Sequence, residues 1–179
     1  MKPIIKDIMK NLQNHPKRLF HVISVALTAS AIAKHHGLNV EEAYLAGMMH
    51  DYSKHENIEF HKKWLSKELI NEYSDSTYVY HALSAANYFK DKYNISDNLY
   101  QAVANHVYGM PNMDKLTQVL FISDSIYFNN FYLYTKALEN LDNATFLVCE
   151  DNIKKIVKRG LVVAKEQKLT YNYYKGVRI

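Results

Sequence analysis

Glycine and proline, the residues that most often interrupt helices, occur only five and three times in this chain of 179 residues. Between them, apolar residues recur three or four positions apart, and no segment of the sequence shows the sustained alternation of a half-buried strand. Apolar residues make up 48% of the chain, which is enough for a substantial core. The sequence therefore predicts a compact, single-domain, all-α bundle of about eight to nine helices.

The bounds of these helices follow from the apolar repeats and from the residues at their ends. Pro16 suits a first helical turn, Gly37 a C-terminal stop and Asn39 an N-terminal cap. Small residues at Ala46 and Gly47 are expected to let a neighbouring helix approach closely. The predicted helices cover residues 4–14, 16–35, 40–51, 57–72, 77–93, 97–109, 115–126, 131–148 and 151–168, before a tyrosine-rich tail over 170–179.

The charge pattern and the cysteine content restrict the compartment and the partners. The formal net charge is +4 without a long Lys/Arg run, which suits a small anionic substrate and does not indicate a nucleic-acid surface. Cys149 is the only cysteine, and residues 1–7 carry charge too early for a signal-peptide core. No stretch approaches 18 uninterrupted apolar residues, so no membrane span is expected. These features predict a cytoplasmic protein and leave its oligomeric state open, a homodimer included.

Four histidines and two aspartates fall within predicted helices or at their ends. They are His21, His50, Asp51, His81, His106 and Asp124. Imidazole and carboxylate groups are ligands of first-row transition metals, and helical proteins build metal sites from side chains of several converging helices. If the six converge, the chain is a metal-dependent hydrolase; if they do not, it is an ordinary helical domain with nine histidines.

Asp124 and the pair His50-Asp51 have the strongest local case for a role in a site. Asp124 lies among large apolar residues, and His50-Asp51 follows the apolar and small residues 45–49. A buried carboxylate or imidazole is costly unless it has a partner or a metal. For Asp124 a ligand role is therefore favoured over a purely structural one.

The other candidates have weaker local support. His21 shares a helix face with Arg18, one turn earlier, but a structural histidine explains His21 equally well. His81 and His106, each taken alone, are more often structural. The remaining histidines are left out as ligands, with His61 placed on a polar face and His55 considered as an outer partner of Asp51; they are His15, His35, His36, His55 and His61.

The order His21, His50-Asp51 and Asp124 over three helices resembles the HD-domain metal-dependent phosphohydrolases. The intervening His81 and His106 are similar to the extra ligands of the binuclear branch. Longer stretches are similar to the bacterial YqeK-type symmetrical bis(5′-nucleosyl)-tetraphosphatases, which cleave diadenosine tetraphosphate into two ADP. These stretches are residues 17–21 with 25–26, 43–54, 106–113 and 171–174.

The resemblance implies an HD domain over residues 1–179, with a metal-binding core of about 16–128, C-terminal helices over 131–168 and the tail over 170–179. It also implies a binuclear transition-metal centre, with iron as the metal, although such ligands suit Mn, Co, Ni or Zn as well. One metal would be held by His21, His50, Asp51 and Asp124. The second would be held by His81, His106 and a bridging Asp51.

The expected reaction is hydrolysis by a hydroxide that bridges the two metals. Arg18 and Lys54 lie one turn from His21 and His50 and are placed to bind phosphate oxygens in catalysis. A solvated lysine is the alternative for Lys54. Tyr108, by stacking on adenine, and the adjacent Gly109 are the remaining candidates for substrate contact.

Two segments depart from the family pattern. Met110 stands where the family commonly has arginine, and residues 124–130 keep Asp124 but lack the Glu, Pro and Arg of the usual stretch. These losses bear on substrate preference and rate rather than on the metal ligands. Two alternatives therefore stay open: an HD-domain phosphohydrolase of a nucleoside monophosphate or guanosine polyphosphate, and a catalytically weakened, metal-containing nucleotide-binding protein. A helical RNA-binding domain is disfavoured because the chain has no basic stripe.

Overall fold

The computed structural model describes residues 1–126 and 130–177, and this part of the chain contains eleven α-helices, one 3₁₀ segment and no strand. The predicted all-α class is confirmed, although the prediction of eight to nine helices was too low. In chain order the elements are α1 (Lys2–Leu12), α2 (Pro16–His35), α3 (Val40–Met49), α4 (Ile58–Trp64), α5 (Lys67–Glu72), η1 (Ser74–Val79), α6 (Tyr80–Tyr93), α7 (Asp97–Asn105), α8 (Lys115–Ser125), α9 (Phe131–Glu139), α10 (Leu141–Lys158) and α11 (Lys165–Val177).

Two breaks account for the wrong helix bounds in the middle and the C-terminal part. The predicted helix over 57–72 is divided because Leu65 is extended and the Ser66 side chain accepts a hydrogen bond from the Leu69 amide, starting α5. Asn140 is likewise extended and caps α10, so the break lies at 140 rather than near 149. Polar caps can fall inside a continuous apolar pattern, which is why the pattern alone missed them.

The prediction of a tail over 170–179 was wrong for residues 170–177, which belong to α11; residues 178 and 179 lie outside the described residues. Thr170 and Tyr174 are one helical turn apart and both are buried. The Tyr174 hydroxyl accepts a hydrogen bond from the Met113 amide at 2.9 Å. The polar helix α11 therefore packs on the rest of the protein through buried Tyr174, although its sequence has no apolar stripe.

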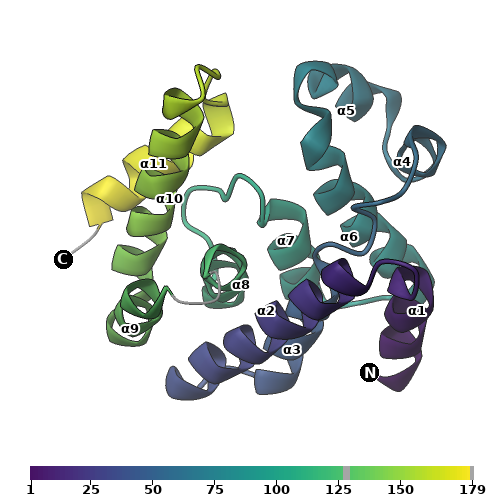
Figure 1. The fold of residues 1–179 in the computed structure, drawn as a ribbon, viewed down its shortest axis with the longest axis horizontal. Coiled ribbons are helices and arrows are strands. Elements are labelled where there is room, and N and C mark those ends of the chain that lie inside the picture. The colour runs from purple at the N-terminus through teal and green to yellow at the C-terminus, as the bar shows by residue number, and fades with distance from the viewer. Residues whose placement is uncertain (127–129, 178–179) are drawn as a thin grey trace.

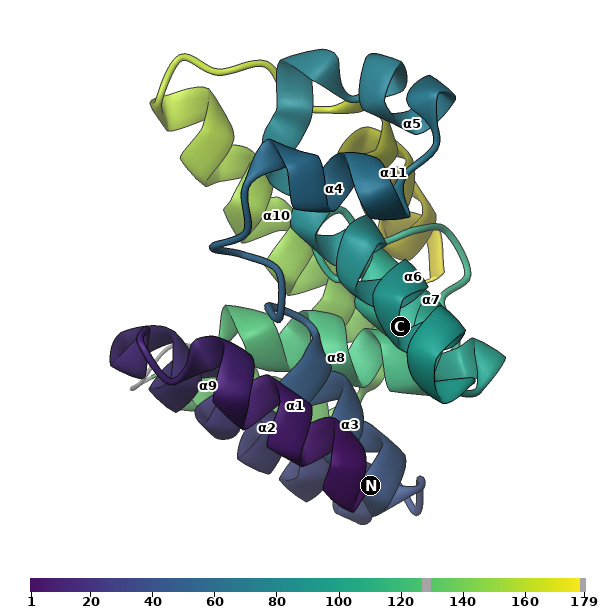
Figure 2. The ribbon, with the colours of Figure 1, turned by 90° about the vertical axis from the view of Figure 1, so that its right-hand side faces the viewer.

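The centre of the molecule is formed by α2, α3, α7 and α8, whose apolar residues belong to one continuous core. Figure 1 shows these helices between α4–α6 on one side and α9–α11 on the other. α1 packs across α2 and α3 (Figure 2). Among residues 1–126 and 130–177, none of the helices combines the length and apolar character that crossing a membrane requires.

The contact between α2 and α3 depends on Gly47. A Cβ atom at this position would lie 2.4 Å from the Cα of Ala26, so any side chain would force the two helices apart. The predicted close approach of a helix at Ala46 and Gly47 is thus confirmed. This close contact brings His21, in the second turn of α2, next to His50 and Asp51, which follow α3.

Candidate metal centre

The six residues predicted as metal ligands meet at one point among five helices. His21 comes from α2, His50 and Asp51 directly follow α3, His81 lies in the first turn of α6, His106 directly follows α7, and Asp124 lies in the last turn of α8. Four of the five segments are helix ends. The positions predicted from the sequence, at helices and helix ends, are therefore the observed ones.

The carboxylate of Asp51 divides the cluster into two halves. Its Oδ2 lies 3.5 Å from Nε2 of His50 and 3.6 Å from Nε2 of His21. Its Oδ1 lies 3.0 Å from Nε2 of His81 and 3.8 Å from Nε2 of His106. Each oxygen thus faces a different pair of imidazoles, and one carboxylate can serve two neighbouring cation positions.

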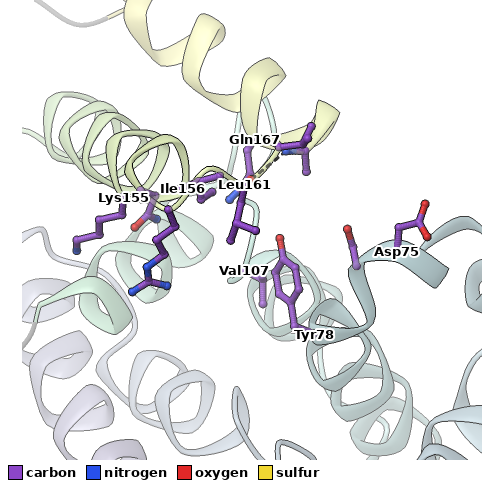
Figure 3. Close-up of a pocket in the computed structure, with 12 residues that line it drawn as sticks. Asp75, Tyr78, Val107, Lys155, Ile156, Leu161 and Gln167 are labelled. Atoms are coloured by element: carbon purple, nitrogen blue, oxygen red, sulfur yellow. Dashed lines mark hydrogen bonds between the residues drawn. The ribbon is translucent and has the colours of Figure 1, made fainter.

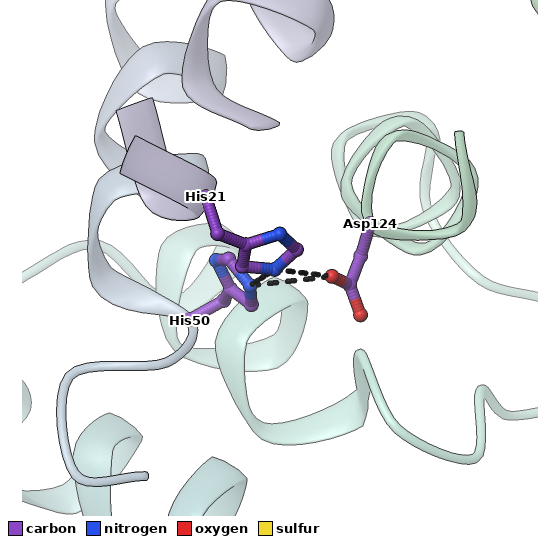
Figure 4. A group of neighbouring side chains, drawn as sticks. All are labelled: His21, His50 and Asp124. Carbon is purple, nitrogen blue, oxygen red and sulfur yellow. Dashed lines mark hydrogen bonds and ion pairs between the residues drawn. The ribbon is translucent and has the colours of Figure 1, made fainter. Parts of the chain in front are cut away.

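Each half also has contacts of its own. Nε2 of His21 lies 3.0 Å from Oδ1 of Asp124 and 3.2 Å from Nε2 of His50, an arrangement visible in Figure 4. In the other half, Nε2 of His81 lies 3.1 Å from Nε2 of His106. The ligand atoms of His21, His50 and Asp124 lie within 4.8 Å of one another. A second group with the same spread, His50, Asp51 and His106, takes one histidine from each half. Both groups are compact enough to hold a metal ion.

Backbone carbonyls orient three of the four imidazoles. In each case Nδ1 lies within hydrogen-bond distance of the carbonyl oxygen three residues earlier. The pairs are His50 with Gly47 (2.7 Å), His106 with Val103 (2.8 Å) and His81 with Tyr78. Because a carbonyl oxygen only accepts, Nδ1 carries a proton and Nε2 is the atom that faces the cluster. This is the orientation that a metal ligand requires.

The electrostatics of the cluster favour a bound cation. Burial raises the pKa of the Asp51 carboxyl, but the charge of His50 and hydrogen bonds from His50 and His81 outweigh it and hold this pKa well below its usual range. Burial opposes protonation of His50, yet Asp51 and Asp124 raise its pKa to about 10. Two ionised carboxylates therefore need positive charge, and a divalent cation would provide it while displacing the proton of His50.

Fixed cations border the same site. Arg18 forms a salt bridge through Nη1 with Oδ2 of Asp51. Nζ of Lys54 lies 3.2 Å from Nε2 of His81 and 3.9 Å from Oδ1 of Asp51. A cavity of about 350 Å³ opens over the cluster, lined by both cations together with His21, Asp51, His81, His106, Val107, Asp124, Ser125, Asn152 and Lys155. Arg18 and Lys54 thus line the cavity over the cluster, and their contact with phosphate stays a prediction.

Tyr108 and Gly109 do not line this cavity. Tyr108 is buried in a small apolar cluster with Leu65, Val79 and Tyr80. Gly109 has a left-handed backbone with φ +66°, and a Cβ atom there would lie 2.8 Å from Cγ2 of Thr170. Their contact with substrate stays a prediction. Met110 is exposed. Of the second departure from the family pattern, residues 127–129 lie outside the described residues, whereas Asn130, at the position of the missing arginine, accepts a hydrogen bond from the Leu133 amide and caps α9.

The placement of His61 on a polar face was wrong, because its side chain is buried beneath the site. Nδ1 of His61 lies 2.8 Å from Oγ of Ser84, which lies 3.0 Å from Oγ of Ser53. The Ser53 hydroxyl donates to the carbonyl oxygen of His81 at 2.8 Å. The neighbouring Lys62 and Lys63 suggested that His61 lies on an exposed, polar helix face. The small polar residues Ser53 and Ser84 were the sequence features that could have indicated a buried His61 side chain. His55, considered as an outer partner of Asp51, stacks on His15 with 4.1 Å between ring centroids and also interacts with the charge of Asp51.

Comparison with known proteins agrees with this geometry. The model of the HD domain family matches residues 18–129, the segment that holds all six clustered residues. This chain belongs to the HD domain family. The fold of this HD domain protein is similar to a crystal structure from Clostridium acetobutylicum, described as a predicted HD superfamily hydrolase involved in NAD metabolism. That chain is 25% identical, with a TM-score of 0.85 and coverage of 99% of this chain and 97% of the other.

Two curated relatives of this HD domain protein are both named symmetrical bis(5′-nucleosyl)-tetraphosphatase. The protein from Halalkalibacterium halodurans is 30% identical over 165 residues, which cover 87% of each chain. The protein from Bacillus subtilis is 24% identical over 174 residues, covering 93% of this chain and 92% of the relative. Relatives that carry this name are thus similar to the chain over most of their length and not only over the HD motif.

Proposed function

We propose that this HD domain protein is a metal-dependent hydrolase that cleaves diadenosine tetraphosphate symmetrically into two molecules of ADP. The observation that carries the proposal is the division of the Asp51 carboxylate between two pairs of imidazoles, next to Arg18 and Lys54. Such a site offers two adjacent cation positions and fixed positive charge for a polyphosphate. The names of the relatives from Halalkalibacterium halodurans and Bacillus subtilis support the choice of substrate.

In this proposal one metal is held by His21, His50, Asp51 and Asp124, and the second by His81, His106 and Asp51. The free Nε2 atoms and the absence of thiolate from this set suit iron, which we propose, as well as Mn, Co, Ni or Zn. When bound, two such ions supply a hydroxide at neutral pH and neutralise charge on the phosphates. The buried, carbonyl-oriented His50, His81 and His106 support this assignment of ligands.

Arg18 and Lys54 act on the substrate. Arg18 would exchange its salt bridge with Asp51 for two phosphate oxygens of the substrate when Asp51 serves as a metal ligand. Lys54 would neutralise a further oxygen from the other half of the site. Hydrolysis forms one bond from the attacking oxygen to phosphorus and breaks the central P–O–P linkage. The second ADP leaves as a phosphate anion, a weak base that needs no acid from the protein.

The test is metal analysis of anaerobically purified protein followed by chromatography of its reaction with diadenosine tetraphosphate. We expect two metal ions per chain, and two ADP as the products. ATP plus AMP would overturn symmetrical cleavage. Two bound metals with nucleotide binding and no hydrolysis would identify the protein as a nucleotide-binding protein that has lost turnover. Hydrolysis in ¹⁸O water should place a single ¹⁸O atom in one of the two ADP products.

A further inference from the structure

A second and larger cavity lies beside the metal centre, between η1 and the turn that joins α10 to α11. Its volume is about 830 Å³, against about 350 Å³ for the cavity over the cluster. Val107, Asn152 and Lys155 line both cavities, so the two meet along these residues. A ligand bound at the cluster can therefore extend directly into the larger cavity.

The walls of the larger cavity are mainly apolar and include one aromatic ring. Figure 3 shows Tyr78 and Val107 on one wall and Ile156 and Leu161 on the other. The Tyr78 ring is supported from behind by Tyr108, edge-on with 5.6 Å between ring centroids. The backbone carbonyl of Tyr78 also lies within hydrogen-bond distance of Nδ1 of His81, so the residue that offers the ring also orients a residue of the cluster.

One face of α10 supplies polar and positive groups to the same cavity. Asn152 and Lys155 lie on α10, and Arg159 caps its C-terminus. The three residues are three and four positions apart, so they line the same side of the cavity. Lys155 also pairs with Asp151 at 2.5 Å, but both side chains are exposed, and such surface pairs are weak. Within residues 1–126 and 130–177, Arg159 forms no ion pair. Both cations are thus available to an anionic ligand.

We propose that this cavity binds one nucleoside diphosphate half of the dinucleoside polyphosphate, which makes Tyr78, Lys155 and Arg159 determinants of substrate specificity. The inference rests on the proposed function, since it divides that substrate between two joined cavities. The nucleobase stacks on Tyr78 against the apolar walls, and Lys155 and Arg159 bind phosphates that extend from the cluster. The volume is within the usual range for a small-molecule site, about 300–1,000 Å³.

The test compares Arg159→Ala and Tyr78→Leu with the matched control Lys158→Ala. Lys158 is the last residue of α10, directly before Arg159, and carries the same charge but lines neither cavity. Calorimetry with ADP and with pyrophosphate is combined with KM for diadenosine tetraphosphate and with metal content. We expect Arg159→Ala to weaken ADP binding and raise KM roughly tenfold to a hundredfold, the effect of losing a charged hydrogen bond. Tyr78→Leu should weaken ADP roughly fivefold or more and leave pyrophosphate unchanged, because only ADP carries a base that can stack.

The outcomes separate this inference from the proposed function. If the wild-type protein forms two ADP and both variants bind ADP and turn over like Lys158→Ala, the cavity assignment is wrong and the function stands. If the wild-type protein does not cleave diadenosine tetraphosphate but loses ADP affinity on Arg159→Ala and Tyr78→Leu, the function is wrong and the nucleotide site stands. Loss of metal or of helical content in a variant would mean that its position supports the fold, which also overturns its assignment.

Discussion

Nε2 of His81 lies 3.0 Å from Oδ1 of Asp51, while Nε2 of His50 approaches the other oxygen of the same carboxylate at 3.5 Å. Asp51 thus approaches the histidines of both halves, each through a different oxygen. The proposed pair of metals therefore depends on a single buried side chain, and replacing it should affect both ions together. Asp124 contacts the histidines of one half only, His21 and His50.

Asp51→Ala is expected to remove both metal ions and to reduce turnover of diadenosine tetraphosphate below detection, because each metal position loses an anionic ligand. Asp124→Ala should lower the metal content from two ions to about one, since the ligands His81, His106 and Asp51 stay in place. The measurement is elemental analysis of anaerobically purified protein, with circular dichroism to check folding. Wild-type metal stoichiometry in folded Asp51→Ala protein would refute the bridging role.

Arg18→Ala is expected to raise KM about tenfold to a hundredfold while metal content stays at the wild-type level, because a charged hydrogen bond to phosphate is lost. Arg18→Lys should recover part of the loss, since it restores the charge but not the two-pronged contact. Steady-state kinetics and metal analysis on the same preparations check both statements. Loss of metal from Arg18→Ala would show that the salt bridge with Asp51 is structural instead.

The sequence indicated those residues of the cluster that lie within or directly after an apolar segment of a single helix. An aspartate among large apolar residues, as at Asp124, and a polar pair after the small-residue stretch 45–49 each imply a partner, because burial without one is costly. His81 and His106 carried no such local signal and became credible only through the resemblance to the family. Their role arises from which helix ends meet, and that is set by tertiary packing.

Contacts between distant elements explain most of what the sequence did not predict. α11 is polar and rich in tyrosine, and only the burial of Tyr174 against the segment near Met113 makes it a packed helix. The burial of His61 has the same cause, since its partner Ser84 comes within reach only when α4 packs on α6. The sequence also could not predict which residues of α10 face the metal centre. An amphipathic pattern identifies the buried side of a helix, but not the element against which that side packs.

Gly47→Ala is expected to destabilise the protein, since a Cβ atom would lie 2.4 Å from the Cα of Ala26 and the backbones of α2 and α3 would have to separate. Overpacking of this kind costs about 1–3 kcal/mol, more than the ~1 kcal/mol that alanine gains over glycine in a helix. The matched control is Gly176→Ala in α11, where no atom lies within 4 Å of the added Cβ and stability should be unchanged or higher. Urea unfolding of both variants provides the measurement, and an unchanged midpoint for Gly47→Ala would contradict the close approach.

Asp7→Asn is expected to lower stability at neutral pH by about 1–2 kcal/mol, because Oδ2 of Asp7 joins α1 to α6 by accepting hydrogen bonds from Tyr88, Lys92 and Tyr93. Burial raises the pKa of Asp7, but these hydrogen bonds outweigh it and lower the pKa below 3.8. A depressed folded-state pKa gives stability that is present above the unfolded value and is lost as the pH falls through the folded value. The difference in unfolding free energy between wild type and Asp7→Asn should therefore be constant near pH 7 and shrink below pH 3.8. Asp91→Asn, an exposed change on α6, should show no such difference, and a pH-independent loss in Asp7→Asn would mean that its charge is not what joins the two helices.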